Sequence, residues 1–317
     1  MISPELRIGT RGSQLALYQA NWVRERLVHV HPDLKVTLVI IKTTGDKIQD
    51  APLAKIGGKG LFVKEIEEAL IQKRVALAVH SIKDVPTELP EELHLSAITT
   101  REDPRDVFIS KDGKKLRELQ QGAKIGTSSL RRQAQLLHFR SDLELIPLRG
   151  NLDTRLNKLE KMNLDGIILA MAGVKRLGFE SRITEIIPPE ISLPAIGQGA
   201  LGIETRKGDK EVEEQIHFLN DPTTAIAVSA ERAFLKKMEG GCQVPIAAFA
   251  RIIDSTIHIH GLVGTIDGKR LIKHHMEGPI DQAESLGTEL AEILLKKGAK
   301  EILEEIYQKS FPTIGGP

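Results

Sequence analysis

The tetrapeptides RIGT (7–10) and KIGT (124–127) each end an apolar, strand-like stretch and lead into a small polar residue and a helical pattern. After both, the apolar spacing predicts the same alternation of strand and helix. The predicted elements of the first copy cover residues 6–10, 13–28, 36–41, 61–71 and 76–79, and those after the second tetrapeptide and its helix cover 143–147, 152–162 and 166–170. This repeated order predicts two α/β lobes of one topology, with parallel strands joined by right-handed crossovers.

Prolines and a change of pattern indicate where the domains meet. Pro104 and the pair Pro188-Pro189 bracket the second lobe, and residues 193–203 are predicted to form a turn and a strand that returns to the first lobe. From Asp221-Pro222, a good helix start, a helix and three alternating strands predict a small α+β domain. We therefore expect a first domain at 1–99 and 199–218, a second at 104–195 and a third at 220–317. Segment 44–60 lacks periodicity and is predicted to be a mobile loop or lid.

The composition excludes several classes of protein. Of 317 residues, 41% are hydrophobic and 27% charged, which is typical of a folded enzyme, and no apolar run approaches the ~20 residues of a membrane span. The 44 Lys and Arg balance the 43 Asp and Glu, so no overall field favours nucleic acid. The histidines lack metal-ligand spacing, and a single cysteine excludes an internal disulfide. Without a signal-peptide pattern at the start, we expect a cytoplasmic protein that binds neither nucleic acid nor a membrane.

Arginine is distributed unevenly. Ten of the 19 arginines lie between residues 101 and 182, and several follow predicted strands at the edge where open α/β sheets bind ligands. Arg131 and Arg132 fall in the first turn of a predicted helix, where the helix dipole disfavours cations by ~0.3–1 kcal/mol each. Two such violations in adjacent positions suggest a bound anion. A solvated basic face is the alternative interpretation.

Three further residues invite a functional interpretation. Lys83 and Asp84 end the third predicted strand. They could form a surface ion pair of little energetic value. If they face an arginine-rich lobe, Asp84 is instead an acid in a cationic cleft. Cys242, the only thiol, follows Gly240-Gly241 directly after a predicted helix. A lone cysteine is usually a small buried hydrophobic residue, but a glycine-opened loop also suits a reactive or modified thiol.

Six blocks of sequence point to a known family. They are RIGTRGSQLAL (7–17), HSIKDVP (80–86), GTSSLRRQAQL (126–136), LRGNLDTRL (148–156), PAIGQGALGIE (194–204) and ERAFLKKMEGGCQVP (231–245). In this order, and over essentially its whole length, the chain resembles the porphobilinogen deaminase (hydroxymethylbilane synthase) family. Together with the strand order, the resemblance implies an α/β fold of two similar βαβ-type lobes, as in the clamshell of periplasmic binding proteins, plus a small α+β C-terminal domain.

The resemblance also implies a reaction. Such a transferase joins four porphobilinogen molecules head to tail, releases ammonia at each step and gives the linear tetrapyrrole hydroxymethylbilane, within tetrapyrrole and heme biosynthesis. Each substrate ring carries an acetate and a propionate, so the growing chain is a polyanion. This accounts for arginines gathered at strand ends in a protein of near-zero net charge. We expect porphobilinogen as the small-molecule partner and a monomeric protein.

Residue roles follow from the same resemblance. Cys242 is expected to hold a dipyrromethane cofactor through a thioether. Asp84 is expected to contact the pyrrole N–H groups, assist proton transfer and stabilise a cationic, azafulvene-like intermediate. The residues expected to bind the cofactor carboxylates are Lys83, Thr127, Ser129, Arg131, Arg132 and Arg155. Those expected near incoming substrate or the elongating chain are Arg11, Ser13, Arg149 and Arg176.

Two other functions fit part of the pattern. A non-catalytic clamshell protein that binds carboxylates would also have duplicated lobes and an arginine-lined cleft, but it would have no use for the Cys242 loop. A thiol-dependent acyltransferase would need a basic partner for Cys242, and no motif supplies one.

Overall fold

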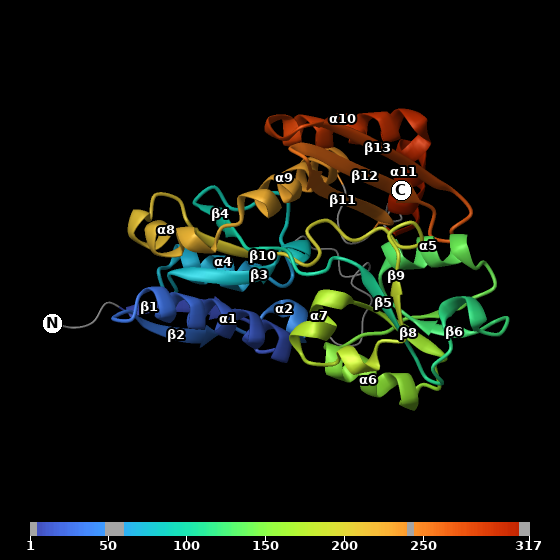
Figure 1. Cartoon of the computed structure of the whole chain (residues 1–317), viewed down its shortest axis with the longest axis horizontal. Helices are drawn as coiled ribbons and strands as arrows, with labels where there is room; N and C mark the ends of the chain where they lie inside the picture. The colour runs from blue at the N-terminus through green and yellow to red at the C-terminus, as the bar shows by residue number, and fades with distance from the viewer. Residues whose placement is uncertain (1–4, 48–59, 240–243, 311–317) are drawn as a thin grey trace, which may run out of the picture.

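A computed structural model describes residues 5–47, 60–239 and 244–310, which form two α/β lobes and a smaller third domain (Figure 1). The first lobe contains a five-stranded sheet in the order β2-β1-β3-β10-β4. Its strands are β1 (Glu5–Thr10), β2 (Lys35–Ile40), β3 (Leu77–Ser81), β4 (Leu93–Ile98) and β10 (Leu201–Arg206). Its helices are α1 (Gln14–Val30), α2 (Thr44–Lys47), α4 (Lys64–Ile71) and α8 (Lys210–Ile216).

The second lobe repeats this plan with the sheet order β7-β6-β8-β5-β9. Its strands are β5 (Asp106–Ser110), β6 (Lys124–Gly126), β7 (Glu144–Ile146), β8 (Gly166–Ala170) and β9 (Glu185–Ile187). Its helices are α5 (Leu130–Phe139), α6 (Leu152–Lys161) and α7 (Met171–Arg176). Short 3₁₀ turns complete the two lobes: η1 (Ile82–Asp84), η2 (Leu116–Glu118), η3 (Glu180–Arg182) and η4 (His217–Leu219).

The two sheets correspond strand by strand. β1 and β6, the strands of the RIGT and KIGT repeats, each lie between two parallel neighbours. The fourth strand of each sheet, β10 or β5, is antiparallel to both of its neighbours and follows a crossing from the other lobe. The predicted fold class is therefore confirmed, and the strand predicted to return to the first lobe is β10. Residues 48–59 of the predicted lid lie outside the described residues, and 44–47 form α2.

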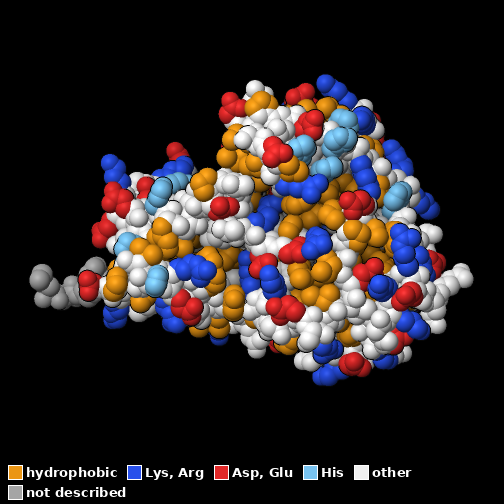
Figure 2. Space-filling model, in the orientation of Figure 1, with side chains coloured by type: hydrophobic (Ala, Val, Ile, Leu, Met, Phe, Trp, Pro, Cys, Tyr) orange, Lys and Arg blue, Asp and Glu red, His pale blue; other side chains and the backbone are white. Residues whose placement is uncertain are grey.

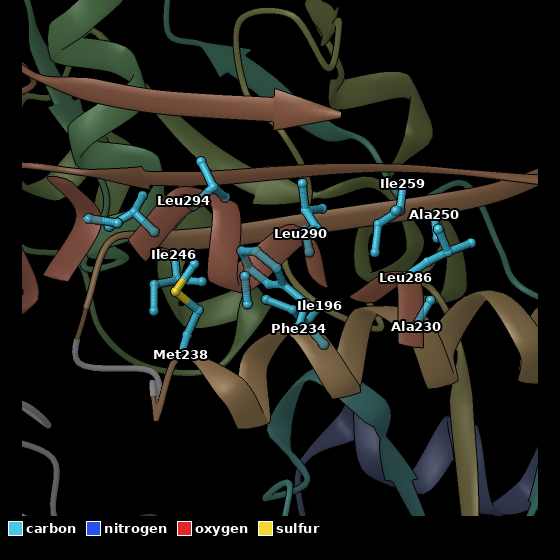
Figure 3. Packing of buried hydrophobic residues seen from close by; sticks show 14 of the residues in the cluster. Ile196, Ala230, Phe234, Met238, Ile246, Ala250, Ile259, Leu286, Leu290 and Leu294 are labelled. Carbon is cyan, nitrogen blue, oxygen red and sulfur yellow. The ribbon is translucent and has the colours of Figure 1, made fainter. Parts of the chain in front are cut away.

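The third domain packs helices against an antiparallel sheet. Its strands are β11 (Ile246–Ile253), β12 (Thr256–Gly264) and β13 (Leu271–Pro279), and its helices are α9 (Pro222–Lys237), α10 (Ala283–Leu294) and α11 (Lys300–Ser310). As expected from Asp221-Pro222, the Asp221 side chain caps α9 by accepting a hydrogen bond from the Thr224 N–H at 2.9 Å. Phe234 and Met238 extend from α9 into the core beneath Leu290 and Leu294 of α10 (Figure 3). The C-terminal helical stretch bends at Gly298, whose φ is 102°.

The three domains meet around one buried carboxylate, that of Glu231 on α9. It accepts two hydrogen bonds from Arg101 in the first crossing, at 2.8 and 2.9 Å. It also accepts from the backbone N–H of Gly197 in the second crossing (2.6 Å) and of Ala250 in β11 (2.8 Å). Each lone pair thus has a donor, as a buried charge requires. The limits predicted for the three domains stay a prediction. No helix within the described residues is long and apolar enough to span a membrane.

Candidate functional site

The predicted polar residues lie at the carboxyl ends of the parallel strands in both lobes. Arg11 and Ser13 follow β1, Asp84 follows β3, and Thr127 follows β6. A pocket of about 60 Å³ in the first lobe is lined by residues that include Arg11, Ser13 and Asp84. In Figure 2, Lys and Arg side chains, with Asp and Glu among them, lie where the first lobe meets the second lobe and the third domain. This edge is where open α/β sheets bind their ligands.

Asp84 ends η1, a single 3₁₀ turn whose position is fixed by the backbone and side-chain contacts of Ile82. The N–H of Ile82 donates to the carbonyl of Ala200 at 3.1 Å, and the Ile82 side chain is buried between Gly197 and Gly202. A Cβ atom at either glycine would lie within 2.4 Å of the Ile82 side chain, so only glycine fits. The result is a rigid turn that leaves the Asp84 carboxylate exposed.

Lys83, beside Asp84, belongs to a cluster of charges that spans the two lobes. Burial lowers the pKa of Lys83, and the positive charges of Arg132 and Arg155 from the second lobe lower it further, while Asp84 opposes them. Burial, followed by the charge of Arg132, also lowers the pKa of Arg155 to about 10. The Nε–H of Arg155 donates to the Gly150 carbonyl at 2.8 Å, so the side chain is fixed in place. Positive charge is therefore concentrated here beyond what nearby acids neutralise.

Arg131 and Arg132 share a buried partner that the sequence analysis missed, Asp106. This carboxylate is 0% exposed; it forms an ion pair with Nη2 of Arg131 at 2.9 Å and accepts a hydrogen bond from Nη2 of Arg132 at 2.8 Å. Ser192 and Gln198 of the second crossing donate to it at 2.8 and 2.9 Å. Burial alone would raise the pKa of Asp106, but the two guanidinium charges hold it well below its ordinary value. The anion inferred from the two arginines is thus, in part, an internal one.

One N–H group of the two arginines, the Nε–H of Arg132, does not donate to Asp106. Among the described residues, no atom accepts a hydrogen bond from Nε of Arg132, although that atom is buried. An orphaned, buried guanidinium N–H is costly unless an acceptor reaches it. At the start of α5, the Ser129 hydroxyl accepts from the Arg132 backbone N–H at 3.4 Å, and the Thr127 hydroxyl accepts from the Ser129 N–H at 3.3 Å. These contacts fix the strand–helix junction beside the free donor.

Arg11 also has an internal partner that the sequence did not reveal. Its guanidinium forms an ion pair with Asp46 of α2 and lies 4.3 Å from the centre of the Phe62 ring. Burial raises the pKa of Asp46, but hydrogen bonds from Arg11 and Thr43 outweigh it, and the pKa lies below its ordinary value. Ser13 caps α1 by accepting from the Ala16 N–H at 3.3 Å. Arg11 is therefore held in place in the lining of the pocket.

The remaining predicted residues are placed less closely. Arg176, at the end of α7, donates to the Gly199 carbonyl of the second crossing at 2.6 Å, and burial lowers its pKa. Arg149 is half-buried and contributes to the positive charge around Arg155. Cys242 lies outside the described residues. Within the described part of the chain, no three His, Cys, Asp or Glu side chains are grouped so as to hold a metal ion.

Fold and site together define a class: two-lobed α/β proteins with a third α+β domain and a cationic cleft that suits a ligand with several carboxylates. A family model described as "Porphobilinogen deaminase, dipyromethane cofactor binding domain" matches residues 6–214. A second, "Porphobilinogen deaminase, C-terminal domain", matches residues 225–296. The chain belongs to the porphobilinogen deaminase family, as its sequence blocks indicated.

Individual relatives agree with this assignment. A porphobilinogen deaminase of Geotalea uraniireducens is 58% identical over 304 residues, which cover 96% of this chain and 95% of that protein. That of Syntrophotalea carbinolica is 57% identical over 314 residues, 99% of this chain and 100% of that protein. Among solved structures, the substrate binding domain of a putative molybdenum ABC transporter from Clostridium difficile has a TM-score of 0.45 and 12% identity, over 70% of this chain and 94% of that one.

Proposed function

We propose that this protein is a transferase, a hydroxymethylbilane synthase. It condenses four porphobilinogen molecules head to tail, with release of four ammonia molecules and uptake of one water, to hydroxymethylbilane. The observation that carries the proposal is the excess of positive charge around Asp84: the charges of Arg132 and Arg155, from the second lobe, lower the pKa of Lys83 in the first lobe, and Arg132 also lowers the pKa of Arg155. Such an arrangement suits a substrate with two carboxylates per ring and a product with eight.

The residues at this site fit a dipyrromethane group. Two linked pyrroles of the substrate type carry four carboxylates, and the site offers a buried, unpartnered Nε on Arg132 together with the half-buried Lys83 and Arg155. We assign Lys83, Thr127, Ser129, Arg131, Arg132 and Arg155 to hold these carboxylates. Attachment is proposed through a thioether to Cys242. When bound, the group supplies the free pyrrole carbon to which the first substrate ring is joined.

Asp84 is assigned the proton transfers. Ammonia leaves more readily when the aminomethyl nitrogen of the substrate is protonated, and its departure leaves a positively charged pyrrole ring. A carboxylate on a rigid, exposed turn can accept hydrogen bonds from the pyrrole N–H and stabilise that charge. The same carboxylate can then take the proton that the attacked ring carbon loses when the new carbon–carbon bond forms.

Arg11, Ser13, Arg149 and Arg176 are assigned to the incoming substrate and the lengthening chain. Arg11 and Ser13 line the pocket that Asp84 also lines, so they can meet the carboxylates of a ring placed there. Arg176 already donates to a backbone carbonyl of the second crossing, and Arg149 lies beside Arg155. A chain bound by these groups would lie along the boundary of the two lobes.

The proposal is tested by intact mass and by turnover. The 35.0 kDa chain, purified after exposure to porphobilinogen, should carry an adduct of two pyrrole units that is absent from Cys242→Ala. The adduct-bearing protein should release four ammonia molecules for each hydroxymethylbilane formed. Unmodified protein with full activity would refute the covalent attachment. Binding of porphobilinogen without ammonia release would favour the non-catalytic binding protein instead. A cytoplasmic location and a monomeric state stay predictions.

A further inference from the structure

Arg232, on the third domain's helix α9, contacts the backbone just after Asp84. Its Nη1 donates to the Val85 carbonyl at 3.2 Å and its Nη2 to the Pro86 carbonyl at 2.6 Å. Arg232 forms no ion pair with any carboxylate of the described residues, and burial lowers its pKa. The planar guanidinium therefore donates hydrogen bonds to two successive carbonyls, a geometry that a lysine ammonium cannot reproduce.

Helix α9 is itself fixed, so Arg232 provides a firm attachment for this turn. The neighbouring Glu231 binds both crossings and β11, as described above. One turn earlier, Val228 is fully buried against Ile82 and Ala200, which places it directly behind η1. Toward the end of the helix, Phe234 and Met238 are buried in the core of the third domain (Figure 3). Contacts at two successive levels of α9 thus hold the turn that carries Asp84.

The same helix leads to the cysteine assigned to the cofactor. α9 ends at Lys237, five residues before Cys242 in the sequence. One element therefore contacts the Asp84 turn through Arg232 and begins the connection to the attachment point. A rate that depends on the distance between a carboxylate and a reacting ring is sensitive to small displacements, because an error of about 1 Å can cost about 100-fold.

We propose that Arg232 is a positioning residue, which sets the place of the Asp84 carboxylate relative to the cofactor by tying the Val85–Pro86 backbone to helix α9. It acts through backbone carbonyls and does not line the pocket that contains Asp84. The inference rests on the function proposed above. It predicts that removing the guanidinium impairs the chemical step and leaves cofactor attachment and substrate affinity nearly unchanged.

The test compares three variants of the cofactor-loaded, full-length protein. Arg232→Met keeps the apolar part of the side chain and removes both hydrogen-bond donors. Arg232→Lys keeps the positive charge, but all of its donor hydrogens are on one nitrogen. Lys236→Met is the matched control, since Lys236 is exposed one helical turn further along the same groove. Mass spectrometry measures cofactor loading, and ammonia release measures kcat and KM for porphobilinogen. We expect Arg232→Met to lower kcat by about 10- to 100-fold with KM within about threefold, Arg232→Lys to lose less, and the control to match the wild type.

A chemical rescue separates positioning from a loss of folded protein. Arg232 lines an open groove of about 790 Å³ between the first lobe and the third domain, which is large enough to admit ethylguanidinium. Millimolar ethylguanidinium should restore part of the kcat of Arg232→Ala, and it should not change that of Lys236→Met.

Several outcomes would overturn the inference. One is a kcat of cofactor-loaded Arg232→Met within twofold of the wild-type value. Another is a loss of activity in Arg232→Met that is proportional to its loss of folded protein and is equally large in Arg232→Lys. If Arg232→Met does not fold, a normal kcat in folded Arg232→Lys together with no rescue of Arg232→Ala would also overturn the inference. Wild-type protein that carries the adduct yet releases no ammonia would refute the proposed function, and this inference with it.

Discussion

Replacing Asp106 by asparagine would leave two buried guanidinium groups without their shared counter-charge. Asp106→Asn keeps the shape of the side chain, but it removes the charge that Arg131 and Arg132 contact at 2.9 and 2.8 Å. Breaking a fully buried ion pair in this way costs about 3–5 kcal/mol. The unfolding entropy of about 2.1 cal/mol/K per residue gives about 1.5 °C per kcal/mol for 317 residues, so Tm should fall by about 4–8 °C.

Ser192→Ala provides the matched control at the same carboxylate. It removes one neutral donor, at 2.8 Å from Asp106, and leaves both ion pairs in place. A hydrogen bond to a charged group contributes about 1.5–3 kcal/mol, so this variant should lose less stability than Asp106→Asn. If both variants melted at the same temperature, the charge of Asp106 would not be what stabilises the pair.

Cofactor loading and pH should then distinguish the variants. Four added carboxylates would partly replace the missing charge, so loading should raise the Tm of Asp106→Asn by more than that of the wild type. The lowered pKa of Asp106 means that its contribution is present above an ordinary aspartate pKa of about 3.9 and is lost as the pH falls below it. The stability difference between wild type and Asp106→Asn should therefore shrink below about pH 4. An equal effect of loading on both proteins, or a difference that grows in acid, would refute the reasoning.

Two further predictions concern single acids. Asp84→Asn should fold and carry cofactor but release ammonia about 100- to 10,000-fold more slowly in a single turnover, whereas Asp84→Glu retains part of the rate; near-equal rates for Asn and wild type would reduce Asp84 to a structural role. Burial, with the charge of Glu204, raises the pKa of Glu67 to about 7, so its contribution to stability is full below its ordinary pKa and is lost as the pH rises through 7. Urea unfolding of wild type against Glu67→Gln should show the wild type losing about 1–3 kcal/mol relative to the variant between about pH 4.5 and 8, and parallel pH curves would contradict this.

Local pattern was enough to predict the lobes, because strand and helix periodicities are properties of neighbouring residues. The RIGT and KIGT repeats predicted equivalent strands, and their glycines fit tight places: a Cβ atom at Gly126 would lie 2.8 Å from Leu164. The antiparallel direction of β10 and β5 depends instead on how the chain crosses between lobes. No residue within either strand signals that path.

The candidate site was predictable where residues share a motif and not where partners are distant in sequence. Asp84, Arg131 and Arg132 stand in recognisable blocks. Asp106 lies 25 residues before Arg131, in a stretch that resembles an ordinary charged turn, and only the fold shows that it is fully buried. Asp46 is likewise 35 residues from Arg11. A helix start that carries two cations could have prompted a search for an internal carboxylate as well as a ligand.

The exchange of strands between the lobes has a consequence for how the protein is made. β3 and β4 do not pair with each other; both pair with β10, which is encoded about a hundred residues later. All strands of the second lobe, by contrast, lie within residues 106–187. As the chain leaves the ribosome, the second lobe can close its sheet while the first, although synthesised earlier, still exposes two strand edges. The first lobe can therefore complete its sheet only after the strands of the second lobe have been made, and unpaired edges are sites of aggregation. Protection of the nascent N-terminal lobe would be needed for about the time that those hundred residues take to emerge, some 5–20 s at ordinary elongation rates.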